Sequence, residues 1–149
     1  MTGALQNIHR MVKPGGKIAI ISFAGEAFSP MAEIFVEQYK ATGREMPPPS
    51  WKRLATKALI SEQFKQAGIN RVNIHLEPLG YTMTDPQMWW DVVWNAGWRI
   101  FLGQMAPPEV ETFRVEHFRR IADVLGADGV WFNTEVLIAI ADKYPGSAA

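Results

Sequence analysis

The stretch Lys13-Pro14-Gly15-Gly16, followed after one lysine by the apolar run Ile18-Ala19-Ile20-Ile21, decides the fold of this chain. Pro14 presets the φ angle at the second position of a type II turn, and Gly15 allows the positive φ that the third position requires. A continuous apolar run is typical of a strand that is buried on both faces of a parallel sheet. The sequence therefore predicts a tight turn that leads into a central strand of an α/β protein.

The segments around this turn predict a helix and two further strands. Leu5, Ile8 and Val12 recur at helical spacing before the turn, and a helix normally ends ahead of a proline. Polar and apolar residues alternate over residues 71–77, which predicts a strand with one face in water, at or near a sheet edge. Residues 136–141 are continuously apolar and predict a second strand that is buried on both faces. Two such strands need more neighbours than a three-stranded sheet provides.

Capping residues and prolines mark the expected starts of four more helices. These are a helix from Ser29-Pro30 to a stop at Gly43, a helix over 62–67 capped by Ser61, a long helix from Asp85-Pro86 to about Met105, and a helix that starts at Pro107-Pro108. The segment 44–50 contains three consecutive prolines and is expected to be irregular. Residues 126–129 predict a turn before the last strand.

The composition limits the classes of function. Fifteen basic and fifteen acidic residues cancel, and no cluster of lysine or arginine follows a helix face, which argues against a nucleic-acid or anionic-membrane surface. Without cysteine, the chain has no disulfide, thiolate metal site or cysteine nucleophile. No apolar stretch approaches the length of a membrane span, and the first ten residues lack the order of a signal peptide. We therefore expect a cytoplasmic protein with one domain.

The expected helix after Asp85-Pro86 carries four of the six tryptophans. Its apolar residues fall on two sides, so the helix has to contact two different things. One side is formed by Trp89, Val92, Val93, Ala96 and Ile100, and the other by Trp90, Trp94, Trp98 and Phe101. Three interpretations stay open, namely packing in the core, a roof over a ligand pocket at the carboxyl ends of the strands, and an interface with a partner.

The histidines and the glycine pair do not predict a reactive site. His9, His75 and His117 are dispersed, without a second ligand at helical spacing on the same face, so no metal site is expected. His117 stands beside Glu116 and near two arginines and is expected on a solvated helix face. The glycine pair follows a helix and precedes a strand, which is the reverse of the order in a phosphate loop. No local signature of a serine nucleophile occurs, so the catalytic residues stay unknown.

The string from Leu5 to Ile20, Leu-Gln-Asn-Ile-His-Arg-Met-Val-Lys-Pro-Gly-Gly-Lys-Ile-Ala-Ile, resembles a segment of the class I S-adenosylmethionine-dependent methyltransferases. It is similar to the group that includes ubiquinone/menaquinone-biosynthesis-type and small-molecule methyltransferases. In that family this segment is the helix before the fifth strand, the turn, and the fifth strand. The resemblance continues with residues 61–68 as the next helix, 71–77 as the sixth strand, and 136–143 as the seventh, which lies antiparallel between the fifth and sixth.

The resemblance implies that residues 1–149 are the C-terminal portion of a Rossmann-like methyltransferase domain, with 26–60 as a lid or linker and 85–126 as inserted helices. The other half of such a domain carries the first four strands and the glycine-rich loop that cradles the cofactor. No Gly-x-Gly-x-Gly loop occurs in this sequence. The implied cofactor is S-adenosylmethionine, with most of its contacts outside this chain. The expected partner is a second copy of the chain or a complementing N-terminal half.

By the same resemblance, the residues that follow the first strand lie at the edge that holds cofactor and acceptor. Phe23, between Ser22 and Ala24, is therefore a candidate for the wall of an acceptor pocket, together with Trp90 and Trp94. Two hypotheses follow, either a methyltransferase that acts on a small-molecule acceptor, or a non-catalytic methyltransferase-like protein that forms a homodimer or pairs with the other half. A nicotinamide dehydrogenase would need a glycine-rich fingerprint of its own, and nothing here favours it.

Overall fold

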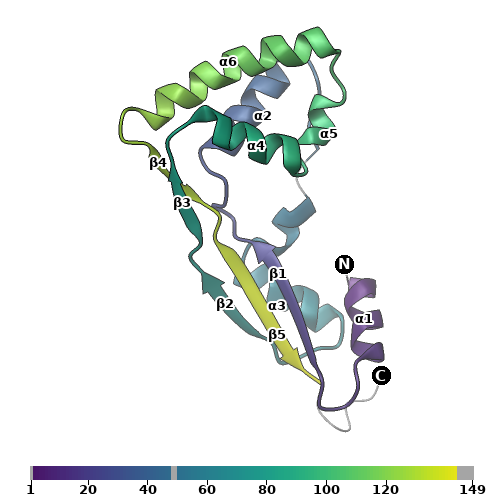
Figure 1. Ribbon diagram of the computed structural model, residues 1–149. Helices are drawn as coiled ribbons and strands as arrows, with labels where there is room; N and C mark the ends of the chain where they lie inside the picture. Colours follow the sequence, from purple (N-terminus) through teal and green to yellow (C-terminus); the bar gives the residue numbers. More distant parts are fainter. Residues whose placement is uncertain (1, 48–49, 144–149) are drawn as a thin grey trace. The chain divides into compact units, whose positions relative to one another are not determined.

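The structure is a computed structural model that describes residues 2–47 and 50–143, and these residues divide into two compact units (Figure 1). Unit 1 contains residues 2–27, 50–79 and 134–143, and unit 2 contains residues 28–47 and 80–133. The chain thus leaves unit 1 twice to build unit 2. The segment 26–60, expected as a lid or linker, contributes to both units.

Unit 1 is a three-stranded sheet with its helices and connections. Its elements are α1 (Thr2–Met11), β1 (Lys17–Phe23), a 3-10 helix η1 (Ser50–Leu54), α3 (Lys57–Gln66), β2 (Asn73–Glu77) and β5 (Val136–Asp142). The strand order is β1-β5-β2, and β5 is antiparallel to both neighbours, with Ile138 opposite Ile21 on β1 and opposite His75 on β2. The last strand therefore lies between two strands that run parallel to each other, which is the expected order.

The turn before β1 has the geometry that the sequence predicts. The Gly16 N–H donates to the Lys13 carbonyl oxygen at 2.9 Å, and Gly15 has a φ of 80°. The turn also joins the end of β5, because the Gly15 N–H donates to the Lys143 carbonyl and the Lys143 N–H donates to the Gly16 carbonyl. The type II turn is thus confirmed, and it fixes the start of β1 against the end of β5.

One face of the sheet is covered by helices, and this face forms the core of unit 1. The apolar residues of this core come from α1, α3, the strands and the connections near them: Leu5, Ile18, Ala24, Leu54, Ile60, Phe64, Ala67, Ile69, Leu137, Ala139 and Ala141. Burial of apolar side chains of this size is the main favourable term in folding. The alternation of the strands sends every second residue of β1 and β5 into this core.

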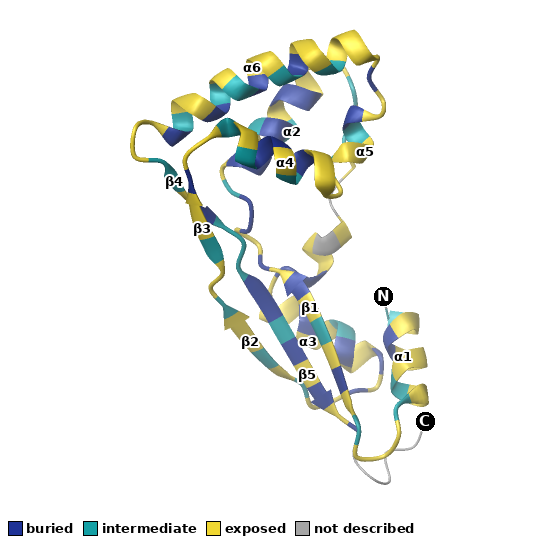
Figure 2. Ribbon diagram, in the orientation of Figure 1, coloured by how far each residue is buried: buried dark blue, intermediate teal, exposed yellow. Residues whose placement is uncertain are grey.

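The expectation that β1 is buried on both faces is wrong for the described chain. Figure 2 shows buried and exposed residues in alternation along this strand, and Ile21 is 67% exposed. β5 was expected to be buried on both faces as well, but it exposes Ile140. The physical reason is that β1 is an edge strand of its sheet and that the helices of unit 1 cover one face only. A continuous apolar run predicts burial on both faces only where both faces have a cover.

Unit 2 is a group of helices joined to a two-stranded ribbon. Its elements are α2 (Met31–Ala41), β3 (Gly80–Met83), α4 (Pro86–Asn95), α5 (Arg99–Leu102), α6 (Pro107–Leu125) and β4 (Val130–Asn133). The antiparallel pair β3–β4 was not expected from the sequence. Each strand has four residues, too few for a clear pattern, and the partners are distant in the chain. Gly80 is required there, since a Cβ would lie 2.5 Å from the Phe132 carbonyl oxygen.

Two expected helix starts are wrong. α3 begins at Lys57, where the Thr56 hydroxyl oxygen accepts from the Leu59 N–H at 3.2 Å, and Ser61 lies inside the helix. Ser29 does not cap α2, because its hydroxyl donates to the Glu33 carboxylate at 2.8 Å. For α3, the serine was ambiguous as a cap because a threonine stands five residues upstream and both types cap well.

The expected long helix from Asp85-Pro86 to Met105 is interrupted. Its start is confirmed, because the Asp85 carboxylate accepts from the Gln87 N–H at 2.8 Å. The helix ends at Asn95, and Ala96 is extended, with φ −113° and ψ −169°. Gly97 follows, and glycine has the lowest helix propensity of all residues except proline. The aromatic residues keep a helical spacing on both sides of the break, so the sequence pattern did not reveal it.

None of the helices in the described part of the chain has the length and apolar character that crossing a bilayer requires.

Candidate functional site

Aromatic side chains form a buried cluster in unit 2. Phe35 of α2 meets the rings of Trp98 and Phe113 edge-on, with ring centroids 5.3 Å apart in both pairs. Trp89 of α4 meets Trp98 at 5.8 Å and Phe132 at 5.7 Å, also edge-on. Edge-to-face pairs at these distances stabilise a core beyond the area that they bury. Trp89 is fully buried and belongs to this core.

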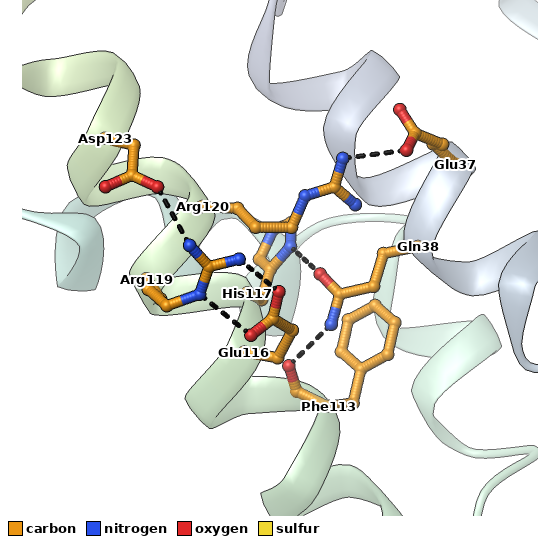
Figure 3. Close-up of polar contacts among 8 residues, drawn as sticks. All are labelled: Glu37, Gln38, Phe113, Glu116, His117, Arg119, Arg120 and Asp123. Atoms are coloured by element: carbon orange, nitrogen blue, oxygen red, sulfur yellow. Dashed lines mark hydrogen bonds and ion pairs between the residues drawn. The ribbon is translucent and has the colours of Figure 1, made fainter.

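A chain of hydrogen bonds runs through the cluster and centres on His117. The Trp89 indole N–H donates to His117 Nε2 at 2.8 Å, and His117 Nδ1 lies 2.7 Å from Gln38 Oε1. Gln38 Nε2 donates to the Phe113 carbonyl oxygen at 2.9 Å (Figure 3). An indole N–H can only donate, so Nε2 accepts and the proton of the neutral ring is on Nδ1. This assignment follows from the hydrogen bonds that surround the ring.

The expectation that His117 lies on a solvated helix face is wrong, because the residue is 0% exposed. Its ring stacks on Phe113 and meets Phe35 edge-on. Burial lowers the pKa of His117 from 6.5 to about 4, and the positive charge of Arg120 lowers it further in the same direction. The sequence did contain a signal, since Phe113, His117, Ile121 and Leu125 recur at a spacing of four and are all buried.

Ion pairs cover the outer side of this network. Arg120 of α6 binds Glu37 of α2 at 2.9 Å, and Arg119 binds Glu116 at 2.7 Å and Asp123 at 3.1 Å (Figure 3). The hydrogen bond and the charge of Arg119 hold the pKa of Glu116 below its usual value. Such exposed pairs contribute little to stability. Glu37 and Glu116 are thereby paired with arginines, and the charge that acts on the buried ring of His117 is the positive charge of Arg120.

Trp90 and Trp94, two candidates for the acceptor wall, lie one turn apart on α4. Their rings stack with centroids 6.4 Å apart and planes 19° apart, and Trp90 also meets Phe118 of α6 edge-on at 6.0 Å. Trp90 is buried, whereas Trp94 is 44% exposed. The guanidinium carbon of Arg99 lies 5.4 Å from the Trp94 ring centroid, within the range of a cation–π contact. The structure therefore brings these two candidates together at a surface.

Phe23, the third candidate, lies in unit 1 at the carboxyl end of β1. It pairs with Val136 of β5 and has an exposed side chain. Its neighbours Ser22 and Ala24 are buried. Of these three residues at the end of the strand, Phe23 is therefore the one with a side chain that a ligand can contact.

One expected grouping on the aromatic helix is wrong. Trp98 was expected on the side of Trp90 and Trp94, but it packs on Trp89 and Phe35. Ile100 was expected beside Trp89, but it is exposed. The reason is the extended residue between α4 and α5, which turns the residues after it away from the continuous helical register.

No group of three or more histidine, cysteine, aspartate or glutamate residues that could hold a metal ion occurs within residues 2–47 and 50–143. Nor do these residues contain a glycine-rich loop between a strand and a helix, the element that holds a nucleotide cofactor. The described residues thus supply aromatic walls, and they do not supply a complete cofactor cradle.

No protein-family model and no curated protein sequence matches this chain. Among 23 solved chains with a match, one is the Haemonchus contortus phosphoethanolamine N-methyltransferase 2, in complex with phosphomonomethylethanolamine and S-adenosylhomocysteine. The two chains are 17% identical, with a TM-score of 0.35, over 97% of this chain and 30% of that chain. The chain thus spans less than a third of that structure. At this TM-score the likeness establishes neither a shared fold nor a shared activity.

Proposed function

We propose that this chain is the C-terminal portion of an S-adenosylmethionine-dependent methyltransferase that acts on a small-molecule acceptor. The observation that carries the proposal is the position of β5, antiparallel between the parallel strands β1 and β2. The sequence resemblance implies this order for the fifth, seventh and sixth strands of the family. Residues 5–20 carry this resemblance, and they lie in α1, in the turn and in β1.

The same strand order separates this proposal from a dinucleotide-dependent dehydrogenase. A doubly wound dinucleotide-binding sheet is mostly parallel, and its strands follow one another through helical crossovers. In unit 1, the middle strand is antiparallel to both neighbours. The glycine-rich fingerprint of a dehydrogenase is absent from the 149 residues as well.

The residues of this chain do not fit S-adenosylmethionine as a complete site, because the cradle that binds its charged end is not among them. The proposal therefore assigns cofactor binding to a segment outside these 149 residues. When bound, the cofactor would supply the methyl group. For the acceptor side, we assign apolar wall residues in each unit by itself: Phe23 in unit 1, and the stacked pair Trp90 and Trp94 in unit 2. Positioning and exclusion of water are the main demands of such a transfer.

The test compares the isolated chain with the native assembly, recovered from the source organism through an affinity tag. Each sample is titrated calorimetrically with S-adenosylmethionine and assayed for transfer of a labelled methyl group to small molecules. We expect micromolar binding by the native assembly and none by the chain alone, because the cofactor loop lies outside the chain. Failure of the native assembly to bind S-adenosylmethionine would overturn the proposal. Micromolar binding by the chain alone would reject a non-catalytic role, and it would overturn the assignment of cofactor binding to a segment outside the chain.

A second candidate function is non-catalytic pairing of two copies through β1. The observation that favours it is the exposure of Ile21 on a strand at the edge of its sheet. An apolar edge strand is a template for pairing with another strand, and natural proteins normally protect it. In this alternative, the β1 strands of two copies pair edge to edge, and their exposed apolar side chains pack beside each other on the same face of the joined sheet.

For this alternative, Ile21→Lys is expected to convert a dimer into a monomer, because pairing would bring the lysines of the two copies close together on the same face of the joined sheet, where like charges repel. The measurement is molar mass by light scattering at high protein concentration. Met11→Lys is the matched control, since Met11 is exposed at the end of α1 and outside the sheet, and it should leave the dimer intact. A wild-type chain that is monomeric at high concentration would reject the pairing.

A further inference from the structure

A pocket of about 490 Å³ lies in unit 2, between α2 and the first half of α6. Its volume falls in the range of small-molecule sites, roughly 300–1,000 Å³. Apolar side chains of Ala41, Met105, Pro108 and Phe113 line it. None of the residues assigned to the acceptor wall contributes to this pocket, so it is a separate feature of the unit.

Of the polar residues that line the pocket, Gln38 is the buried one. This residue is 8% exposed and lines the pocket. Its Oε1 accepts from His117, and its Nε2 gives one hydrogen to the Phe113 carbonyl oxygen. A primary amide carries two hydrogens on its nitrogen. Among the described residues, the second hydrogen has no acceptor. An oxygen atom of a ligand in the pocket would accept this hydrogen and add one hydrogen bond.

The charges at the rim argue against an anionic occupant. Arg44 binds both carboxylate oxygens of Glu109, at 3.0 and 3.1 Å, and Glu116 also lines the pocket. The Ala106 N–H and Arg44 lower the pKa of Glu109, and Arg119 lowers that of Glu116, so both carboxylates are ionised at neutral pH. The lining carries two carboxylates and one guanidinium, and all three are paired, Glu109 with Arg44 and Glu116 with Arg119. Because the guanidinium of Arg44 is already bound, the described lining offers no free cation that would attract an anion.

We propose that this pocket binds a small neutral molecule, mainly apolar, with a carbonyl or ether oxygen that accepts the second hydrogen of Gln38. The apolar walls supply the burial of the ligand, and the buried amide of Gln38 fixes its orientation. The proposal depends on unit 2 alone and holds whether or not the chain takes part in methyl transfer.

The first test is a titration of the wild-type chain, followed by heteronuclear NMR of the backbone and side-chain amides. The probes are acetophenone, ethylbenzene, which lacks the oxygen, and benzoate, which is anionic. We expect acetophenone to shift the Gln38 side-chain amide and the backbone amides of Ala41 and Thr42. Ethylbenzene should bind roughly fivefold more weakly, the loss that one hydrogen bond represents, and benzoate should not bind.

Three outcomes would overturn the proposal. If acetophenone shifts no pocket residue at millimolar concentration, the pocket is not a ligand site. If ethylbenzene binds as tightly as acetophenone, Gln38 does not donate a hydrogen bond to an oxygen of the ligand. If the shifts follow the concentration of protein and not that of the probe, the occupant is a second copy of the chain.

The second test fills the pocket without touching Gln38. Ala41→Leu adds side-chain volume from an exposed position of α2 that lines the pocket, and it should weaken acetophenone binding by roughly fivefold or more through steric exclusion. Ala122→Leu makes the same change at an exposed position of α6 outside the pocket and should bind like the wild type. Tryptophan fluorescence checks that both variants are folded. Binding by Ala41→Leu equal to that of the wild type would place the ligand elsewhere and reject the site.

Discussion

Acidification from about pH 7 to about pH 4 is expected to cost this protein about 3 kcal/mol of unfolding free energy through His117 alone. In the folded state, burial and then Arg120 lower the pKa of His117 from 6.5 to about 4. Between these two values, the unfolded state takes up a proton and the folded state does not. The stabilisation is therefore complete above about pH 6.5, decreases as the pH falls, and is gone below about pH 4.

The structural reason is that both ring nitrogens of His117 are committed in the neutral form. Nε2 accepts the Trp89 indole N–H, so a proton on this nitrogen would face a donor. The charge that acts on the ring is that of Arg120 on its own helix. Figure 3 draws four further charged residues of α2 and α6, namely Glu37, Glu116, Arg119 and Asp123. Glu37 and Glu116 are both paired with arginines, and Arg120 adds to the penalty on an imidazolium.

The measurement is urea unfolding, followed by tryptophan fluorescence, at several pH values. Five of the six tryptophans lie in unit 2, so the signal reports mainly on this unit. The control is His117→Gln. Its side-chain amide places an oxygen or nitrogen near Trp89 and Gln38, the partners of the ring, but it does not ionise. The pH dependence of the wild type should exceed that of His117→Gln by about 3 kcal/mol over this interval. Identical pH dependence of the two proteins would show that His117 is not held neutral.

Phe35→Ala is expected to lower the unfolding free energy by about 3–5 kcal/mol, the usual cost of replacing a buried phenylalanine by alanine. Phe35 is fully buried and meets four rings, those of Tyr39, Trp98, Phe113 and His117. The substitution removes the ring that α2 contributes to this cluster and leaves a cavity beside the imidazole. No comparable loss is expected from a surface position.

The same denaturation experiment measures this loss, with amide hydrogen exchange to locate it. Val115→Ala on α6 is the matched control, because Val115 is exposed and its truncation should change the free energy by no more than about 0.5 kcal/mol. Exchange in Phe35→Ala should rise first for the amides of α2 and α6. A loss below about 1 kcal/mol would mean that the aromatic cluster does not hold unit 2 together.

The features of the fold that could be predicted depend on residues close together in the sequence. The type II turn follows from Pro14 and Gly15, and its hydrogen bond and positive φ are observed. The start of α4 follows from Asp85 before a proline, and the cap is observed. The three strands of unit 1 follow from two apolar runs and one alternating run. Local chemistry is sufficient in these cases because a turn, a cap or a strand is selected within a few residues.

The features that could not be predicted depend on contacts between distant segments. His117 has charged neighbours in sequence, but Trp89 and Gln38, which bind its ring, come from other helices. The ribbon β3–β4 joins two four-residue strands that are far apart in the chain. The spacing of four that includes His117 indicates burial, but only the partners decide whether a polar ring is tolerated inside.

By itself, the sequence determined the turn at residues 13–16, the three strands of unit 1, and the resemblance to a methyltransferase segment, which implied the order of these strands. Only the tertiary structure decided that β1 leaves one apolar face open, that Trp98 packs away from Trp94, and that His117 is a neutral core residue. Local propensity and periodicity are properties of neighbouring residues. Burial, pKa and pocket shape are set by atoms that the chain brings together from distant positions, so they became visible only in the folded protein.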